Sequence, residues 1–228
     1  MAGAYGGPEV LSVIDVAVPE PRPNEVRITV RAAGVNPFDY KSYSGAFGVD
    51  PERLPVRLGV EAAGVVTAVG ADAIGPAGPI AVGDEVITYT APGAYAAEIV
   101  VPASSVVPKP VALSWEQAGG LLAAGVTAVH ALEAVGLGKG ETVLIHGAAG
   151  GVGLVAVQLA VARGATVVAT ASRAKHEVRE AARLQLTEAA TAGRLRIVIA
   201  DSHPLREAAT AHREIMAGHT TGKIVLVL

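Results

Sequence analysis

The chain has 228 residues, 51% of them hydrophobic and 17% charged, which suffices for one large domain or two modest ones. A formal net charge of −3 gives no general attraction to polyanions, so we expect neither nucleic acid nor a membrane as a partner. Cysteine is absent, which excludes disulfides and thiolate chemistry and fits a reducing, cytoplasmic compartment. We see no signal peptide and no apolar run long enough to span a membrane.

Residues 1–113 predict an all-β domain. Short valine-rich segments are separated by glycine and proline, which is typical of strands closed by turns. We expect strands in "EVRITVRAAGV", "GVEAAGVVTAVG", "GDEVITYT" and "AYAAEIVVP".

The pattern changes to α/β at Ser114. From there apolar residues recur at helical spacing, with Ser114 as the expected N-cap and Gly136 or Gly138 as the stop. "TVLI" (142–145) and "GATVVAT" (164–170) then read as two buried strands on either side of a helix at 151–163. This order predicts one βαβ unit with parallel strands.

The glycine cluster at the start of that helix fits a phosphate-binding fingerprint. Ala148, Gly150 and Gly153 occupy the positions of G-x-G-x-x-G, with alanine in the first place. Gly150 permits close approach of a pyrophosphate, Gly153 permits helix–strand packing, and the free N–H groups around Gly151 and Val152 favour an anion. A purely structural turn between strand and helix is the alternative.

The end of the second strand indicates which dinucleotide is preferred. An NAD-binding fold usually places a carboxylate there to hold the ribose, but this sequence has Thr170. Ser172, Arg173, Lys175 and His176 follow and offer a hydroxyl and cations to a 2′-phosphate. We therefore predict NADP(H) as the cofactor; ordinary cations on an exposed helix start are the alternative reading.

Together these motifs resemble the medium-chain dehydrogenase/reductase superfamily, in its zinc-independent quinone oxidoreductase branch. The resemblance rests on "GVNPFDYKSYSG", "LGVEAAGVV", "GVTAVHAL", "VLIHGAAGGVG" and "AHREIMAGHTTGKIVLVL". It implies a GroES-like β-barrel catalytic domain, a Rossmann domain, and NADPH-dependent reduction of a quinone or an activated α,β-unsaturated carbonyl. Reduction of enoyl thioesters, known from relatives in this family, is an alternative that differs only in the substrate.

The resemblance also predicts that no metal takes part. Asn36 stands where zinc-containing relatives have a cysteine ligand, and Val60 stands where they have a histidine. An amide and a valine cannot rebuild a zinc site. Hydrogen-bond donors must then polarise the substrate, and the resemblance points to Asn36, Tyr40 and Lys41.

Each candidate also has a structural alternative. Asn36 can open a turn, Asp39 can cap a short helix, and Tyr40 and Tyr43 can be core aromatics. Tyr43 replaces an arginine that is frequent in the family, which leaves substrate preference open.

Two residues of the second half have the same ambiguity. Thr127 resembles a family residue near the nicotinamide and phosphates, but a threonine inside a helix can also bond its own backbone. We expect His146, at a strand end, to be packed rather than catalytic.

The nucleotide-binding part looks shortened. Only one long helical stretch (173–192) follows the second strand, so the Rossmann domain is restricted to 114–193 and roughly 80 residues of the usual fold are missing. We place the join at 180–183 and expect residues 194–228 to return to the catalytic domain.

An apolar strand would then lose its neighbour, which invites pairing with a second copy. The alternative to an active reductase is a catalytically silent remnant that serves as an interaction or structural module.

Overall fold

The computed structural model describes residues 1–171 and 197–228, which form two compact units. The first unit comprises Met1–Leu122, Asp201–Gly218 and Ile224–Leu228, and the second comprises Ala123–Ala200 and His219–Lys223. The division falls at Leu122 rather than at Ser114, because the helix after Ser114 packs on strands of the first unit.

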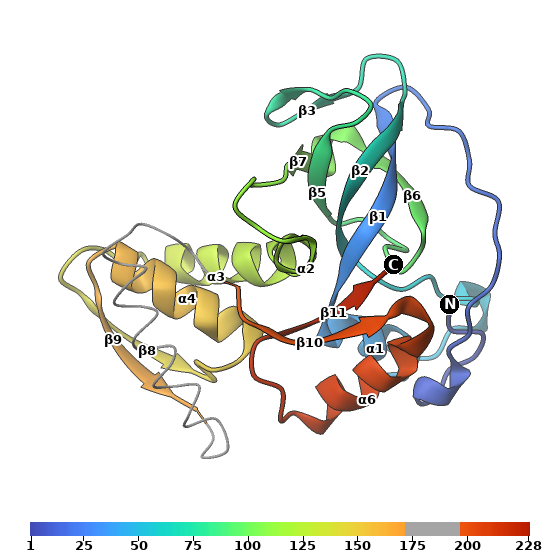
Figure 1. Ribbon diagram of the computed structural model, residues 1–228. Coiled ribbons are helices and arrows are strands. Elements are labelled where there is room, and N and C mark those ends of the chain that lie inside the picture. The colour runs from blue at the N-terminus through green and yellow to red at the C-terminus, as the bar shows by residue number, and fades with distance from the viewer. Residues whose placement is uncertain (172–196) are drawn as a thin grey trace. The chain divides into compact units, whose positions relative to one another are not determined.

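A seven-stranded sheet organises the first unit (Figure 1). Its elements, with a two-stranded β3–β4 ribbon, are β1 Glu25–Val35, α1 Pro37–Tyr43, β2 Glu61–Val69, β3 Ile74–Gly75, β4 Gly78–Pro79, β5 Glu85–Tyr89, β6 Glu98–Pro102, β7 Val106–Pro108, α2 Trp115–Gly119, β10 Ile199–Pro204, α6 Ala208–Ala217 and β11 Lys223–Val227. All four strands expected in the N-terminal half are present.

Strand β1 is central because it has partners on both edges along its length. One edge pairs with β2, whereas the other pairs with β6 at Glu25–Thr29 and then with β11 at Ala32–Val35. The sheet order is β10-β11-β1-β2-β5-β7. The end of the chain therefore supplies two strands to a sheet that begins at residue 25, as the sequence predicted for the returning segment.

Apolar side chains on the strands form the main core. Its buried members are Val26, Ile28, Val30, Ala33, Ala62, Val66, Ala73, Val86, Ala91, Ala94, Ile99, Val101, Ala103 and Val106. Alternation along β1 places every second residue from Val26 to Val30 in this core. Helix α2 packs against β1 and β2, and its expected cap is confirmed, since the Ser114 hydroxyl accepts a hydrogen bond from the Gln117 N–H at 3.3 Å.

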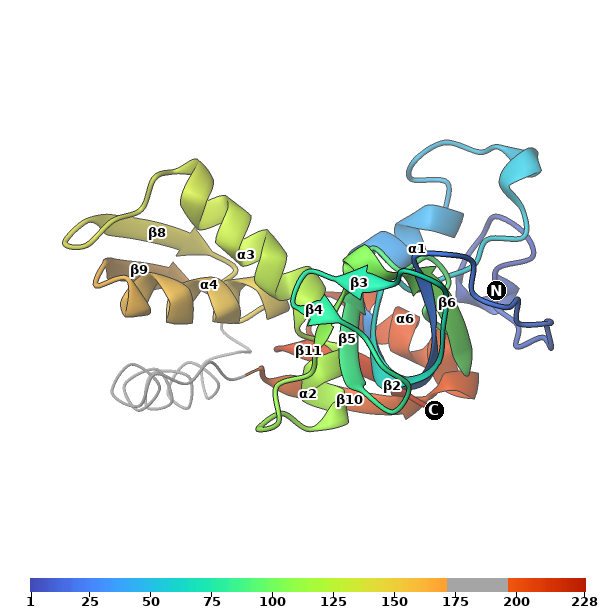
Figure 2. The same cartoon turned by 90° about the horizontal axis from the view of Figure 1, so that it is seen from above.

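The second unit contains the predicted βαβ arrangement. Its described elements are α3 Leu122–Ala134, β8 Thr142–His146, α4 Gly151–Ala162 and β9 Thr166–Thr170. Strands β8 and β9 are parallel, and α4 packs against both, as Figure 2 also shows. The helical stretch that the sequence begins at Ser114 is two helices, because α2 ends at the cap Gly120. The predicted helix at 173–192 and the join at 180–183 lie outside the described residues. Among the helices that the structure describes, none is long and apolar enough to cross a bilayer.

The prediction that both strands of this unit are buried is wrong. Val143, Ile145 and Val167 pack against Leu132 of α3 and neighbouring apolar residues. On the strands' other face, Leu144 is 55% exposed and Val168 is 50% exposed. Parallel strands normally have helices on both faces, and within the described residues only one face of this pair has that cover.

Candidate functional site

The turn between β8 and α4 brings consecutive backbone groups together at the end of the sheet. Gly147 has a φ of 67°, in the left-handed region that favours glycine. The Gly147 carbonyl accepts a hydrogen bond from the Gly150 N–H at 2.9 Å, and the Ala148 N–H donates to the Thr170 carbonyl at 2.9 Å. These bonds fix the turn to the carboxyl end of β9, where nucleotides bind in open α/β sheets.

Helix α4 begins within the glycine cluster, with Gly150 as its N-cap. The Leu154 N–H donates to the Gly150 carbonyl at 2.9 Å, so the N–H groups of residues 151–153 lie in the first turn, where a helix offers donors to an anion. At Gly153 a Cβ would overlap the Gly147 carbonyl and the Ala148 backbone. Val152 is 39% exposed. The five predicted loop residues therefore lie together at one helix start.

The C-terminal segment lies beside this loop, a feature that sequence reasoning missed. The Gly222 N–H donates to the Ala149 carbonyl at 3.2 Å. A Cβ on Gly151 would lie 2.9 Å from Cδ of Lys223, so the stem of this buried lysine packs against the helix start. The helix start and the C-terminal segment are roughly 70 residues apart in the sequence, so no local sequence pattern indicates that they are in contact.

The remaining predicted cofactor residues fall into two groups. Ser172, Arg173 and Lys175 lie outside the described residues. The Thr127 hydroxyl donates to the Ala123 carbonyl at 2.6 Å, which is the backbone contact of the alternative reading. His146 Nδ1 lies 2.8 Å from the Thr170 hydroxyl.

In the first unit, Asn36 lies at the junction of β1 and α1, as the N-cap of α1. Its amide Nδ2 donates to Glu61 Oε1 at 3.0 Å and, more weakly, to the Gly34 carbonyl at 3.4 Å. Glu61 is only 1% exposed, and a Cβ on Gly34 would overlap its carboxylate. Both N–H groups of the Asn36 amide thus have protein acceptors. To donate to a substrate, the amide would have to break one of these two hydrogen bonds.

Asp39 holds the backbone of Asn36 in place. Its Oδ2 accepts from the Asn36 N–H at 2.7 Å and from the Tyr95 hydroxyl at 2.9 Å, while Oδ1 accepts from the Gly59 N–H at 3.2 Å. The capping role anticipated for Asp39 is present. With the side chain 1% exposed, this carboxylate links α1 to two other segments of the unit.

The hydrogen-bonded chain continues to a buried histidine on α6. The Tyr95 hydroxyl lies 3.3 Å from His212 Nε2, and the Tyr43 hydroxyl lies 2.8 Å from His212 Nδ1. Tyr43 and His212 are fully buried, so Tyr43 is a core residue. Sequence reasoning missed Glu61, Tyr95 and His212, although a single carboxylate within the apolar "GVEAAGVV" was a signal.

Burial controls the ionisation of these groups. It raises the pKa of Tyr43 to about 12, with smaller contributions from Asp39 and Glu9 that exceed the opposite effect of Arg213. Burial also raises the pKa of Tyr95 well above its ordinary value, reinforced by Asp39, and lowers the pKa of His212 to about 4. At neutral pH the two phenols and the imidazole are therefore uncharged hydrogen-bonding groups.

The other two predicted substrate-side residues are on α1. Tyr40 is half-buried and packs in a small cluster with Ala2, Tyr43 and Leu58. Lys41 is half-exposed. Both follow Asn36 closely on one short helix, so α1 presents the three candidate residues from a single element.

A barrel-like β unit and a βαβ unit with a glycine-rich turn define a class, the nicotinamide-dependent dehydrogenases with GroES-like and Rossmann-type domains. Residues 22–111 match the alcohol dehydrogenase GroES-like domain, and residues 83–226 match the zinc-binding dehydrogenase family. The chain therefore belongs to the zinc-binding dehydrogenase family of the medium-chain dehydrogenase/reductase superfamily.

Individual relatives agree with this assignment. A quinone oxidoreductase from Pseudomonas aeruginosa is 42% identical over 171 residues, which is 74% of this chain and 51% of the relative. The solved quinone oxidoreductase from Coxiella burnetii aligns with a TM-score of 0.86 at 26% identity, covering 99% of this chain and 97% of that one. The Escherichia coli quinone oxidoreductase complexed with NADPH aligns at 0.80, with 23% identity, 99% of this chain and 98% of that one, which supports the fold. The chain spans about half the length of the curated relatives it matches.

The residues at the expected catalytic zinc position do not fit that metal. Asn36 offers an amide that is already bonded to Glu61, and Val60 offers no donor. Zinc in such sites takes thiolate, imidazole or carboxylate ligands. No step of the reaction is therefore assigned to a metal at Asn36.

Proposed function

We propose that the chain is an NADPH-dependent oxidoreductase that transfers hydride to a quinone or an activated α,β-unsaturated carbonyl without zinc. The observation that carries this proposal is the glycine turn at the start of α4, where Gly150 caps the helix and Gly153 allows close packing. A backbone cradle of this kind suits a pyrophosphate. The identity to quinone oxidoreductases supports the substrate class.

In the proposed reaction, NADPH supplies the hydride and a proton from water completes the quinol or saturated carbonyl product. Residues 148 and 150–153 would hold the pyrophosphate of a bound cofactor, Thr127 would contact it, and Ser172, Arg173 and Lys175 would hold the 2′-phosphate. Lys223, whose stem packs on Gly151, adds a positive charge near the phosphates. On the substrate side, Tyr40 and Lys41 would donate hydrogen bonds to the developing oxyanion, and Asn36, held by Glu61, fixes the start of the helix that carries them.

Cofactor binding tests the proposal directly. Titration of NADPH should enhance and blue-shift its fluorescence at micromolar concentration. Replacing Arg173 and Lys175 together by alanine should weaken NADPH binding at least about tenfold, since a charge-assisted contact contributes about 1.5–3 kcal/mol when desolvated and less when exposed, with little effect on NADH. Equal losses for the two cofactors would remove the assignment to NADP.

Steady-state rates test two further points of the proposal, the substrate class and the independence from metal. We expect reduction of quinones or enones at a rate unchanged by EDTA, because Asn36 and Val60 supply no zinc ligand set. A rate lost with EDTA and restored by zinc would contradict metal independence. An enoyl thioester tested in parallel distinguishes the enoyl reductase alternative.

A second candidate function is a catalytically silent interaction module. The exposed side chains of Leu144 and Val168 favour it. A nucleotide-binding unit that is ordered only part of the time binds its cofactor weakly. Absence of any NADPH fluorescence change would support this alternative.

The main proposal also includes a homodimer formed through β8. It includes a cytoplasmic location as well, which the absence of cysteine supports.

A further inference from the structure

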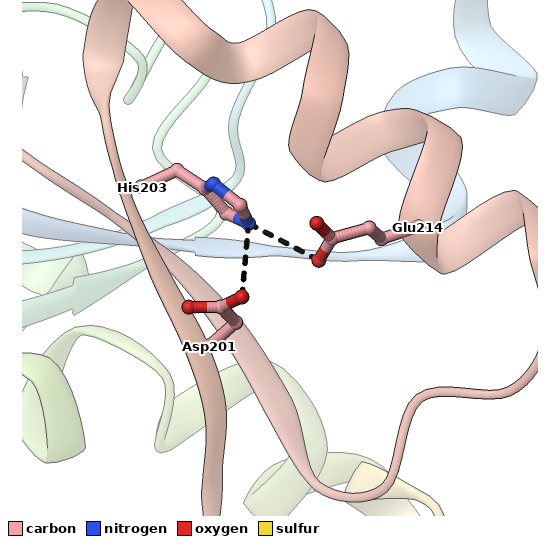
Figure 3. Close-up of side chains that lie close together, drawn as sticks. All are labelled: Asp201, His203 and Glu214. Atoms are coloured by element: carbon pink, nitrogen blue, oxygen red, sulfur yellow. Dashed lines mark hydrogen bonds and ion pairs between the residues drawn. The ribbon is translucent and has the colours of Figure 1, made fainter.

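Three potential metal ligands converge near the C-terminal end of the first unit (Figure 3). Asp201 and His203 are two residues apart on β10, so their side chains leave the same face of the strand. Glu214 approaches from α6. His203 Nε2 lies 3.1 Å from Glu214 Oε2 and 3.7 Å from Asp201 Oδ2, and all three donor atoms lie within 4.8 Å of one another.

These spacings suit a small divalent ion. Ligands about 2.0–2.1 Å from a tetrahedral zinc ion are about 3.3–3.5 Å from one another, between the two measured distances from His203. Imidazole nitrogen and carboxylate oxygen are both zinc donors, and a site with three protein ligands keeps water in the fourth position. The side chains of Asp201 and Glu214 are 56% and 39% exposed, so both ion and water can reach the group.

Contacts outside the group orient two of its members. The Ser202 N–H donates to Asp201 Oδ1 at 2.7 Å, which directs the other carboxylate oxygen toward His203. On the far side of the imidazole, Nδ1 lies 4.0 Å from Glu207 Oε2. Metal-bound histidines usually donate their other ring N–H to a carboxylate or carbonyl, and at 4.0 Å Glu207 lies near that position without being hydrogen-bonded to His203.

Charge favours a divalent ion over a histidine–carboxylate ion pair alone. Two carboxylates approach Nε2, whereas an imidazolium carries one positive charge. The third carboxylate, Glu207 near Nδ1, is itself 3.6 Å from the Arg206 guanidinium. His203 is 8% exposed, so water screens its immediate surroundings only in part.

We propose that Asp201, His203 and Glu214 bind one Zn²⁺ ion, with Glu207 as a positioning residue. The ion joins strand β10 to helix α6 and thereby stabilises the returning segment of the first unit. It takes no part in hydride transfer, so the proposal is independent of the proposed oxidoreductase function.

Zinc binding to the full chain tests the site without an activity assay. Metal-free protein is titrated with Zn²⁺ in competition with a chromophoric chelator, and thermal unfolding is followed with and without the ion. We expect one equivalent bound and a raised Tm. His203→Gln and Glu214→Gln should each weaken binding at least about tenfold, and Glu207→Gln about tenfold, with the zinc-dependent rise in Tm lost in the first two.

His130→Gln provides the matched control, because it makes the same exchange at an exposed histidine of α3 and should bind zinc as the wild type does. Circular dichroism shows whether each variant is folded. Co²⁺ gives a second measurement, since its visible absorption should appear with wild type and be absent with folded His203→Gln. No zinc uptake by the wild type, or equal uptake by folded His203→Gln, means that the group is an ion-paired cluster only and overturns the proposal.

Discussion

Asp39 is the residue on which the geometry around Asn36 depends. One buried carboxylate accepts from Asn36, Tyr95 and Gly59. Because Tyr95 continues to His212 and Tyr43, the candidate substrate-side helix is connected by hydrogen bonds to α6. Networks of this kind fix side-chain positions when every member is satisfied.

Replacing Asp39 by asparagine should loosen Asn36 and destabilise the fold. An amide nitrogen cannot accept a hydrogen bond, so at least one of the three donors loses its partner, at a cost of about 1–3 kcal/mol each in the free energy of unfolding. We expect kcat for quinone reduction to fall while the dissociation constant of NADPH stays near the wild-type value. Urea unfolding, steady-state kinetics and NADPH titration measure these effects. Asp15→Asn, in an exposed segment, should change none of them.

Tyr43 should make the stability of the protein fall at alkaline pH. Its pKa is about 12 in the folded protein and about 10 in the unfolded chain. The fold therefore favours the protonated phenol, and this contribution is complete below pH 10 and is lost as the pH rises toward 12. In Tyr43→Phe the free energy of unfolding should decline less steeply over this range. The single tryptophan reports unfolding, and identical slopes for the two proteins would contradict the assignment.

At the scale of elements, the junction of β8 and α4 depends on close backbone contact. Gly147 provides the left-handed turn and Gly153 lets α4 start directly above it. Two bonds, from Ala148 to β9 and from Gly222 to Ala149, then hold the loop to neighbouring segments. The loop is therefore shaped before any ligand binds.

Gly153→Ala should displace the start of α4. A Cβ at this position overlaps backbone rather than a flexible side chain, and forced overpacking costs about 1–3 kcal/mol. If about 1.4 kcal/mol of that cost falls on the cradle, NADPH binding weakens about tenfold. Fluorescence titration measures the loss. Gly138→Ala is the control, because the nearest atom to its Cβ is a carboxylate oxygen of Glu141 at 3.4 Å; equal affinities in the two variants would exclude a packing role for Gly153.

For the molecule as a whole, the two units differ in how completely their strands are paired and covered. In the first unit β1 pairs with three strands and its core side chains are almost fully buried. Among the described residues of the second unit, β8 pairs with β9 alone. The described part thus has a well-covered sheet and a two-stranded one with an exposed apolar face.

Hydrogen exchange should reveal this difference. In dilute protein, the amides of residues 143–145 should exchange faster than those of residues 26–30, with opening free energies lower by at least about 1.4 kcal/mol, or tenfold in rate. Protection that increases with protein concentration would indicate pairing of β8 with a second copy. Equal protection of both segments in a dilute monomer would contradict a weakly covered second unit.

The local features of the fold could be predicted from the sequence. Alternating valines predicted the strands, the glycine fingerprint predicted the turn before α4, and Ser114 predicted a helix cap, because these signals depend on neighbours within a few residues. Which distant groups meet could be seen only in the folded chain. His212 lies with Tyr43 across 169 positions and Glu61 lies with Asn36 across 25. Among the described residues, Leu144 is exposed although its side chain is apolar. Such contacts depend on the path of the chain, which no short pattern encodes.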